Sequence, residues 1–127
     1  INKLNFSIGT NKAPGSYNVC VGFFDGGGWH NTSGFTPTLN TWYQVVGTYD
    51  GSTIKQYVNG VINSSFGYSG TPQSGGDIRL MRRWDSADNN SVNFVDGDLA
   101  IVKIYNDHLS TLQIQQNFND NKARFGL

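Results

Sequence analysis

The chain has 127 residues, nine basic and nine acidic side chains, one cysteine and a net charge of zero. A chain of this length can bury a core without metals or disulfides, so we expect a single domain over residues 1–127. The even charge balance excludes nucleic-acid binding through a basic face. No apolar run approaches the roughly 20 residues of a membrane span, which excludes membrane insertion.

The composition favours strands and tight turns, with three Trp, six Tyr, eight Phe and sixteen Gly. Residues 4–8 alternate apolar and polar side chains, and residues 9–15 are typical of a turn or loop. Residues 17–24 predict a second strand with its odd-numbered side chains on one face. Period-two alternation bounded by glycine is the pattern of a half-buried strand.

The centre of the chain predicts three antiparallel strands. Residues 41–49 and 53–58 are strand patterns joined by a tight turn at 50–52, and Asn59-Gly60 leads into a third strand at 61–63. Asn-Gly between apolar runs favours a type I′ turn, whose two central residues need positive φ. Strands joined by such short turns lie side by side.

Further strands are predicted after a loop rich in Gly and Ser. They cover residues 77–84 and 92–95, separated by a polar loop at 85–91. Residues 98–105 (DLAIVKIY) are strongly β-branched. We expect this last strand at the centre of a sheet.

One helix is predicted, beginning at Ser110. Ser110 and Gln113 have the spacing of a capping box, and Leu109 and Ile114 that of a hydrophobic staple. Ile114 and Phe118 lie one turn apart and would fix the helix to the strands.

Three stretches together resemble the concanavalin A-like lectin/glucanase superfamily, in its laminin-G-like and pentraxin-like branch. They are 41–51 (TWYQVVGTYDG), 57–60 (YVNG) and 94–110 (FVDGDLAIVKIYNDHLS), and the resemblance covers about residues 17–119. It implies an all-β, antiparallel two-sheet jelly-roll sandwich with one short C-terminal helix. Because this chain offers only two strands before residue 41, we expect the C-terminal portion of a longer protein whose N-terminal strands lie elsewhere.

Two residues depart from the resembled pattern. Gln56 occupies a strand position that is usually apolar in relatives, and Ile101 one that is usually polar. Ile101 either belongs to a patch between subunits or is a single exposed isoleucine. A sandwich without an edge strand leaves an unpaired ladder, so completion by a neighbouring chain, including a homo-oligomer, stays open.

The tail at 118–127 (FNDNKARFGL) is similar to that of members from bacteriophages and other viruses. The resemblance implies a non-enzymatic binding or assembly module of a virion structural protein, on a phage tail, fibre or capsid surface. Its partners would be a glycan or receptor on a cell surface, or neighbouring virion subunits. The lone Cys20 excludes an intrachain disulfide and favours assembly in the host cytoplasm. The alternative is a carbohydrate-binding or adhesion module of a secreted, extracellular or cell-surface protein.

Catalysis is not expected. Asp96 and Asp98 are the only carboxylates with the alternating spacing of a glycan-cleaving pair, but they flank a glycine at a turn, and the chain has no Glu. Cys20 lies in an apolar strand pattern and is predicted to be a buried, inert thiol. His30 and His108 fall in predicted loops and belong to no metal motif.

Three aromatic residues in or beside loops are candidate glycan-stacking positions: Trp29, Tyr68 and Trp84. A flat ring flanked by polar groups can hold a sugar, and Trp29 stands between Gly28 and His30. The alternative, which we favour for Trp29, is a loop anchor that packs onto the sheet. Trp42 and Tyr49 are predicted to be core residues.

The loop at 85–91 raises the question of Ca²⁺, which the resemblance also implies. Asp85, Asp88 and Asn89 supply hard oxygen ligands, but the loop lacks the spacing of an EF-hand. Since Ca²⁺ takes six to eight oxygens, an ion here and an ordinary solvated loop are both open, and we favour the loop.

Overall fold

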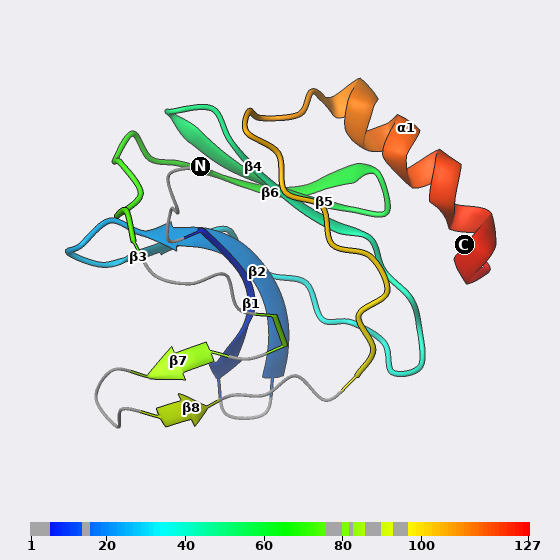
Figure 1. Ribbon diagram of the computed structural model, residues 1–127, viewed down its shortest axis with the longest axis horizontal. Coiled ribbons are helices and arrows are strands. Elements are labelled where there is room, and N and C mark those ends of the chain that lie inside the picture. Colours follow the sequence, from blue (N-terminus) through cyan, green and yellow to red (C-terminus); the bar gives the residue numbers. More distant parts are fainter. Residues whose placement is uncertain (1–5, 14–15, 76–79, 82, 86–89, 93–96) are drawn as a thin grey trace.

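The structure, a computed structural model, describes residues 6–13, 16–75, 80–81, 83–85, 90–92 and 97–127. Two three-stranded antiparallel sheets, with strand orders β1-β2-β3 and β4-β5-β6, are accompanied by a two-stranded β7-β8 ribbon and a C-terminal helix (Figure 1). The elements are β1 (Phe6–Ala13), β2 (Ser16–Phe24), β3 (Trp29–Asn31), β4 (Val45–Tyr49), β5 (Thr53–Val58), β6 (Val61–Gly67), β7 (Arg83–Asp85), β8 (Asn90–Val92), α1 (Thr111–Lys122) and the 3-10 helix η1 (Ala123–Phe125). The predicted all-β antiparallel sandwich with one short helix is confirmed.

The first sheet begins with a long hairpin. β1 pairs with β2 from Phe6↔Phe23 to Ala13↔Ser16, so the turn predicted over 9–15 is wrong for residues 9–13. The polar residues in this stretch belong to the strand because each of them is paired with a residue of β2. The predicted β2 face is confirmed where the structure describes it, since Val21 and Phe23 are fully buried.

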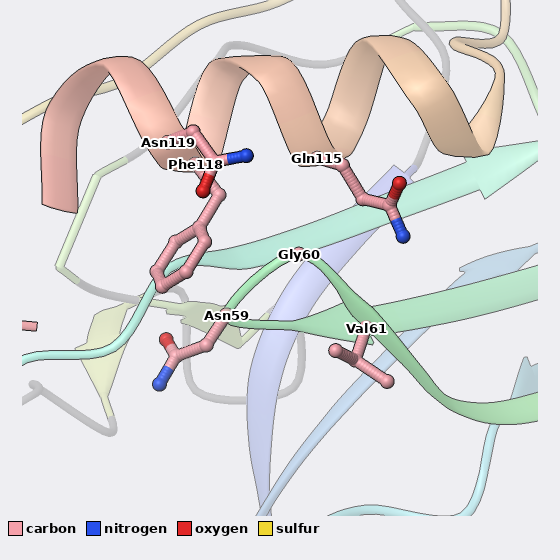
Figure 2. A pocket seen from close by; sticks show the side chains of 6 residues that line it. All are labelled: Asn59, Gly60, Val61, Gln115, Phe118 and Asn119. Carbon is pink, nitrogen blue, oxygen red and sulfur yellow. The ribbon is translucent and has the colours of Figure 1, made fainter.

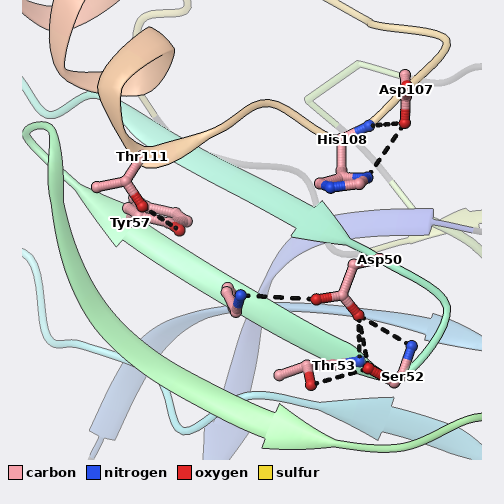
Figure 3. Close-up of polar contacts among 8 residues, drawn as sticks. Asp50, Ser52, Thr53, Tyr57, Asp107, His108 and Thr111 are labelled. Carbon is pink, nitrogen blue, oxygen red and sulfur yellow. Dashed lines mark hydrogen bonds and ion pairs between the residues drawn. The ribbon is translucent and has the colours of Figure 1, made fainter.

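The second sheet follows the two predicted turns. Asn59 and Gly60 have φ values of +51° and +80°, as the type I′ turn requires. At the other turn, Asp50 Oδ1 accepts hydrogen bonds from the backbone N–H of Ser52 (2.9 Å) and Thr53 (2.8 Å) (Figure 3). These bonds lower the pKa of Asp50 from 3.8 to about 2. β4 starts at Val45, four residues later than predicted.

The core lies where the two sheets face each other. Val21 and Phe23 of β2 pack with Ile54 of β5, and the rings of Phe23 and Tyr49 are 4.8 Å apart. Gly47 of β4 lies directly against the first sheet, because a Cβ there would lie 2.3 Å from Val21 Cγ1 and 2.8 Å from Phe6 Cε1. Only a residue without a side chain fits at this distance.

Gln56 crosses from one sheet to the other inside this core. Its side chain is fully buried, and its Nε2 donates to the Val19 carbonyl of β2 over 2.8 Å. Its Oε1 accepts from Asn63 Nδ2 at 2.9 Å. Both ends of the amide are therefore satisfied, as a buried polar group requires. Gln56, a polar residue at a position that is usually apolar, therefore links the two sheets by a hydrogen bond.

The predicted start of the helix and its capping box are confirmed. Ser110 Oγ accepts from the Gln113 N–H, Gln113 Oε1 accepts from the Ser110 N–H, and Ile114 is fully buried. The Tyr57 and Thr111 hydroxyls lie 3.2 Å apart, which joins β5 to the first turn (Figure 3). In Figure 1 the β4-β5-β6 sheet lies between α1 and the first sheet.

Two predictions about the core are wrong. Residues 98–105 form no strand, since they pair with none of the described strands, and their apolar side chains are exposed. Trp42 is 38% exposed, and its ring packs on Phe125, 5.0 Å away. The strand predicted over 77–84 is reduced, within the described residues, to β7, and the loop predicted at 85–91 contains the start of β8.

Candidate functional site

The structure separates two of the aromatic residues singled out from the sequence. Trp29 and His30 are neighbours in β3, so their side chains point to opposite faces of the sheet. The Trp29 ring packs 5.7 Å from Phe24 and is 47% exposed. His30 instead turns toward Phe23 and stacks on Tyr68, with ring centroids 3.6 Å apart. Trp29 and Tyr68 therefore do not share one platform.

Asp25, His30 and Tyr68 form a hydrogen-bonded cluster at the β2-β3 turn. Asp25 Oδ1 accepts from the N–H groups of Gly27 (2.8 Å) and Gly28 (2.9 Å). Asp25 Oδ2 lies 3.0 Å from His30 Nε2 and accepts a hydrogen bond from the Tyr68 hydroxyl. Both carboxylate oxygens are thus occupied, and the cluster holds the glycine-rich turn against the end of β6.

These bonds set the charge state of the cluster. The Tyr68 hydroxyl, followed by the two glycine amides, lowers the pKa of Asp25 well below its ordinary value. The hydrogen bond to Asp25 and burial raise the pKa of Tyr68. Asp25 is therefore an ionised acceptor over the whole physiological range. A general acid needs a raised carboxyl pKa, so this arrangement suits an anchor and not an acid catalyst.

Asp25 makes the fold sensitive to acid. Its folded-state pKa is lower than the ordinary value of 3.8, so its contribution to stability is complete above that pH and is lost as pH falls further. Asp50, with a pKa of about 2, acts in the same direction. We expect the urea midpoint to fall between about pH 4 and pH 2, and to fall less in Asp25→Asn. Asp98→Asn, which changes an exposed carboxyl, is the control; identical acid profiles for Asp25→Asn and the parent would contradict this role.

The other predicted site residues are placed as follows. Trp84 lies in β7 opposite Ser91, and Asp85 opposite Asn90. Asp88 and Asn89 lie outside the described residues, so the predicted Ca²⁺ loop stays a prediction. Within the part of the chain that the structure describes, no three His, Cys, Asp or Glu side chains gather as metal ligands. Asp25 is a poor ligand because its oxygens already accept hydrogen bonds from several donors.

Cys20, His30 and Asp98 were predicted to have no catalytic role, and the structure describes the surroundings of each. Cys20 is buried, its Sγ donates to the Gly9 carbonyl at 3.5 Å, and burial raises the pKa of the thiol. A thiol held protonated is a weak nucleophile. His30 lies in β3 and not in a loop, which corrects that prediction. Asp98 is exposed, and its predicted companion Asp96 lies outside the described residues.

A shallow hollow of about 240 Å³ lies between the β5-β6 turn and α1 (Figure 2). It is lined by Asn59, Gly60, Val61, Gln115, Phe118 and Asn119. A Cβ on Gly60 would lie 3.2 Å from Phe118, so the turn and the helix are in close contact beside it. The hollow is smaller than the roughly 300–1,000 Å³ of ordinary ligand sites, and we place no ligand there.

Comparison with known families identifies the fold. A laminin G family model, described as the concanavalin A-like lectin/glucanases superfamily, matches residues 2–115. The chain belongs to this superfamily. The resemblance carried by residues 41–51, 57–60 and 94–110 is confirmed at this level.

Comparison with solved structures finds a chain of similar fold. An S-layer domain-containing protein (residues 221–444) from Clostridium thermocellum is 21% identical, with a TM-score of 0.52 over 88% of this chain. This chain spans 64% of the length of that structure. A comparison with curated proteins finds no match. Among the described residues, no helix is long and apolar enough to cross a membrane.

Proposed function

We propose that this chain is a non-enzymatic binding module of a structural protein at an outer surface, and that it contacts glycans through Trp29. The observation that carries the proposal is the Trp29 ring itself, 47% exposed and backed by Phe24 at 5.7 Å. A flat, supported and exposed ring is what a sugar face stacks on. The Asp25 cluster fixes the turn that precedes Trp29 in the chain.

The chemistry of Asp25 and Asp50 supports binding in preference to catalysis. The pKa of Asp25 is lowered because it accepts hydrogen bonds from the Tyr68 hydroxyl and from two turn amides, and that of Asp50 because it accepts from Ser52 and Thr53. Glycan hydrolysis needs one carboxyl group with a raised pKa beside an ionised one. Neither carboxylate meets the first requirement, and each has a structural task of its own.

Two settings fit an outer-surface module. The leading one is a virion structural protein of a phage tail, fibre or capsid surface, supported by the similarity of the 118–127 tail to viral members. In the structure this tail packs Phe125 onto Trp42. The alternative is an adhesion module of a secreted or cell-surface protein, which the likeness to an S-layer domain-containing protein favours.

Glycan-array binding tests the proposal. Trp29→Ala is expected to weaken binding by at least about fivefold, because stacking on one aromatic ring contributes about 1 kcal/mol or more. Thermal stability should change little, since the ring is half exposed and lies outside the core. Titration of the parent and the variant against the best array ligand measures the ratio.

Trp42→Ala is the matched control, because it removes the same side chain from the contact with Phe125 on another part of the surface. It should leave glycan affinity unchanged while lowering stability. A parent chain that binds no glycan, or a Trp29→Ala variant with full affinity, would overturn the proposal. Release of reducing ends from a bound polysaccharide would overturn its non-enzymatic part.

A further inference from the structure

Asn59 and Gly60, the two central residues of the β5-β6 turn, form the only Asn-Gly pair in the sequence. Asparagine deamidates most easily before glycine, because no side chain hinders the backbone nitrogen of glycine. The Gly60 nitrogen attacks Asn59 Cγ, the Cγ–Nδ2 bond breaks, and Nδ2 leaves as ammonia with the proton of the Gly60 N–H. Water then opens the cyclic imide at either carbonyl carbon, which gives aspartate or isoaspartate.

The type I′ turn holds the two reacting atoms apart. Asn59 and Gly60 have φ values of +51° and +80°, and Val58 pairs with Val61 across the turn. The first central residue of such a turn has a ψ of about +30°, which places the Gly60 nitrogen about 150° from Asn59 Cβ around the Cα–C bond. Closure of the imide ring needs these two atoms nearly eclipsed. The reaction therefore requires that the turn open first.

Two hydrogen bonds to Gln44 hold Asn59 in this conformation. The Gln44 N–H donates to Asn59 Oδ1 at 2.9 Å, and the Asn59 N–H donates to the Gln44 carbonyl, also at 2.9 Å. The side-chain carbonyl that Gly60 would attack is therefore bound to the residue that precedes β4. Rotation of this carbonyl toward Gly60 breaks the first bond and leaves the Gln44 N–H without its acceptor.

Helix α1 packs on the glycine of the turn. Gly60 is buried, and a Cβ built on it would lie 3.2 Å from both Cβ and Cδ1 of Phe118 (Figure 2). Rotation of the turn needs the space that Phe118 occupies. Ile114 is the one buried residue of α1, and local opening begins in elements that bury few apolar side chains. Movement of α1 is therefore the step that frees the turn.

We propose that Asn59 is a latent modification site, which deamidates when α1 lifts and the turn opens, and that the isoaspartate formed keeps α1 from docking again. Isoaspartate carries the main chain through the former side chain, which adds one backbone carbon between Val58 and Gly60. The turn then no longer joins Val58 to Val61 in register, and Gly60 leaves its place against Phe118. A reversible opening becomes a permanent one.

The rate of deamidation in the folded and the unfolded chain tests the protection. Peptide mapping by mass spectrometry, after incubation in mildly alkaline buffer, measures the aspartate and isoaspartate that replace Asn59. The folded parent should react at least about a hundredfold more slowly than the parent in guanidinium chloride, because only the opened fraction reacts.

Phe118→Ala tests the part played by α1. It uncovers Gly60 and should raise the rate at Asn59 at least about tenfold in a chain that circular dichroism shows to be folded. Phe118→Leu keeps an apolar side chain over the turn and should react like the parent. Leu112→Ala, the matched control, shortens a side chain of the same helix that is 78% exposed, and should also react like the parent.

The two products of the reaction test its consequence. The isoaspartate form, separated from the aspartate form by chromatography, should melt at a lower temperature than the parent and lose α1 faster to a protease. Asn59→Asp is the control, because it keeps the ordinary backbone and an acceptor for the Gln44 N–H. It should melt close to the parent.

Equal rates at Asn59 in the folded and the unfolded parent would overturn the proposal. So would a Phe118→Ala variant with the parent's rate, because α1 would then not control the turn. Asn63 of β6 is the internal reference: a rise at Asn59 and Asn63 together would assign the reaction to global unfolding and overturn the role of α1. An isoaspartate form as stable as Asn59→Asp would contradict the permanent opening. None of these outcomes depends on glycan binding by Trp29.

Discussion

Gln56→Glu is expected to destabilise the chain by about 4 kcal/mol at neutral pH, a large part of the 5–15 kcal/mol that a domain of this kind has. The substitution keeps the shape of the side chain and changes one donor into an acceptor. The introduced carboxylate would face the Val19 carbonyl oxygen, now 2.8 Å from the Gln56 amide nitrogen. Two acceptors cannot bond to each other, and a buried charge without a partner costs several kcal/mol.

The loss should be reversed by mild acid. Burial raises the pKa of the introduced carboxyl by roughly 3 units above the unfolded value, so its neutral form is present in the folded state below about pH 7. Because the folded pKa is the higher one, stability is greatest at low pH and falls as pH rises through that pKa. The neutral carboxyl can donate to Val19 and accept from Asn63, as the glutamine does. We expect about 3 kcal/mol to be regained between pH 8 and pH 5.

Urea unfolding of the variant and the parent at these two pH values measures the effect. Neither Asp25 nor Asp50 titrates in this window, because both have pKa values lowered from 3.8. Asn63→Ala is the control, since it removes the exposed partner of Gln56 and introduces no titrating group. Equal stability of Gln56→Glu and the parent at pH 8 would show that the amide does not bond across the sheets.

The parts of the fold that could be predicted are those that depend only on residues close together in the sequence. Asn59-Gly60 needs two positive φ values, and Ser110 with Gln113 needs only its own backbone, so both were found from the sequence. Gln56 was recognised only as an exception, because its bond partner Val19 is 37 positions away. Residues 98–105 have strand composition, but a strand also needs a neighbour, which no local pattern supplies.

In the candidate site, too, local features could be predicted from the sequence and long-range contacts could not. Trp29 and Tyr68 were selected because each is an aromatic residue in or beside a predicted loop, and Trp29 is indeed exposed. That they point away from each other depends on β3 pairing with β2, which places His30 and not Trp29 next to Tyr68. The one available signal was the alternation of side chains within residues 29–31, once these are taken as a strand. Asp25 before three glycines was readable as a turn anchor, but not its bond to Tyr68, 43 residues later.

Gly47→Ala is expected to destabilise the chain by about 2 kcal/mol, because the new methyl group would force the sheets apart. The Cβ would lie 2.3 Å from Val21 Cγ1, and Val21 is fully buried and cannot turn into solvent. Gly67→Ala is the matched control: it lies in β6 of the same sheet, and a Cβ there meets nothing within 4 Å. That variant should be neutral or slightly more stable, because alanine loses less chain entropy than glycine on folding.

The difference between the two glycine variants isolates the contact between sheets, since the entropy gain is common to both. Combining Gly47→Ala with Val21→Ala tests whether Val21 is the residue that the new methyl group would meet. Each substitution alone should be destabilising, one by crowding and one by leaving a cavity, but together they exchange a methyl group across the interface. The double variant should therefore be at least about 1 kcal/mol more stable than additivity predicts. Additive losses in urea unfolding would mean that β4 and β2 do not meet at Gly47, and the sandwich would then need a different packing of its two sheets.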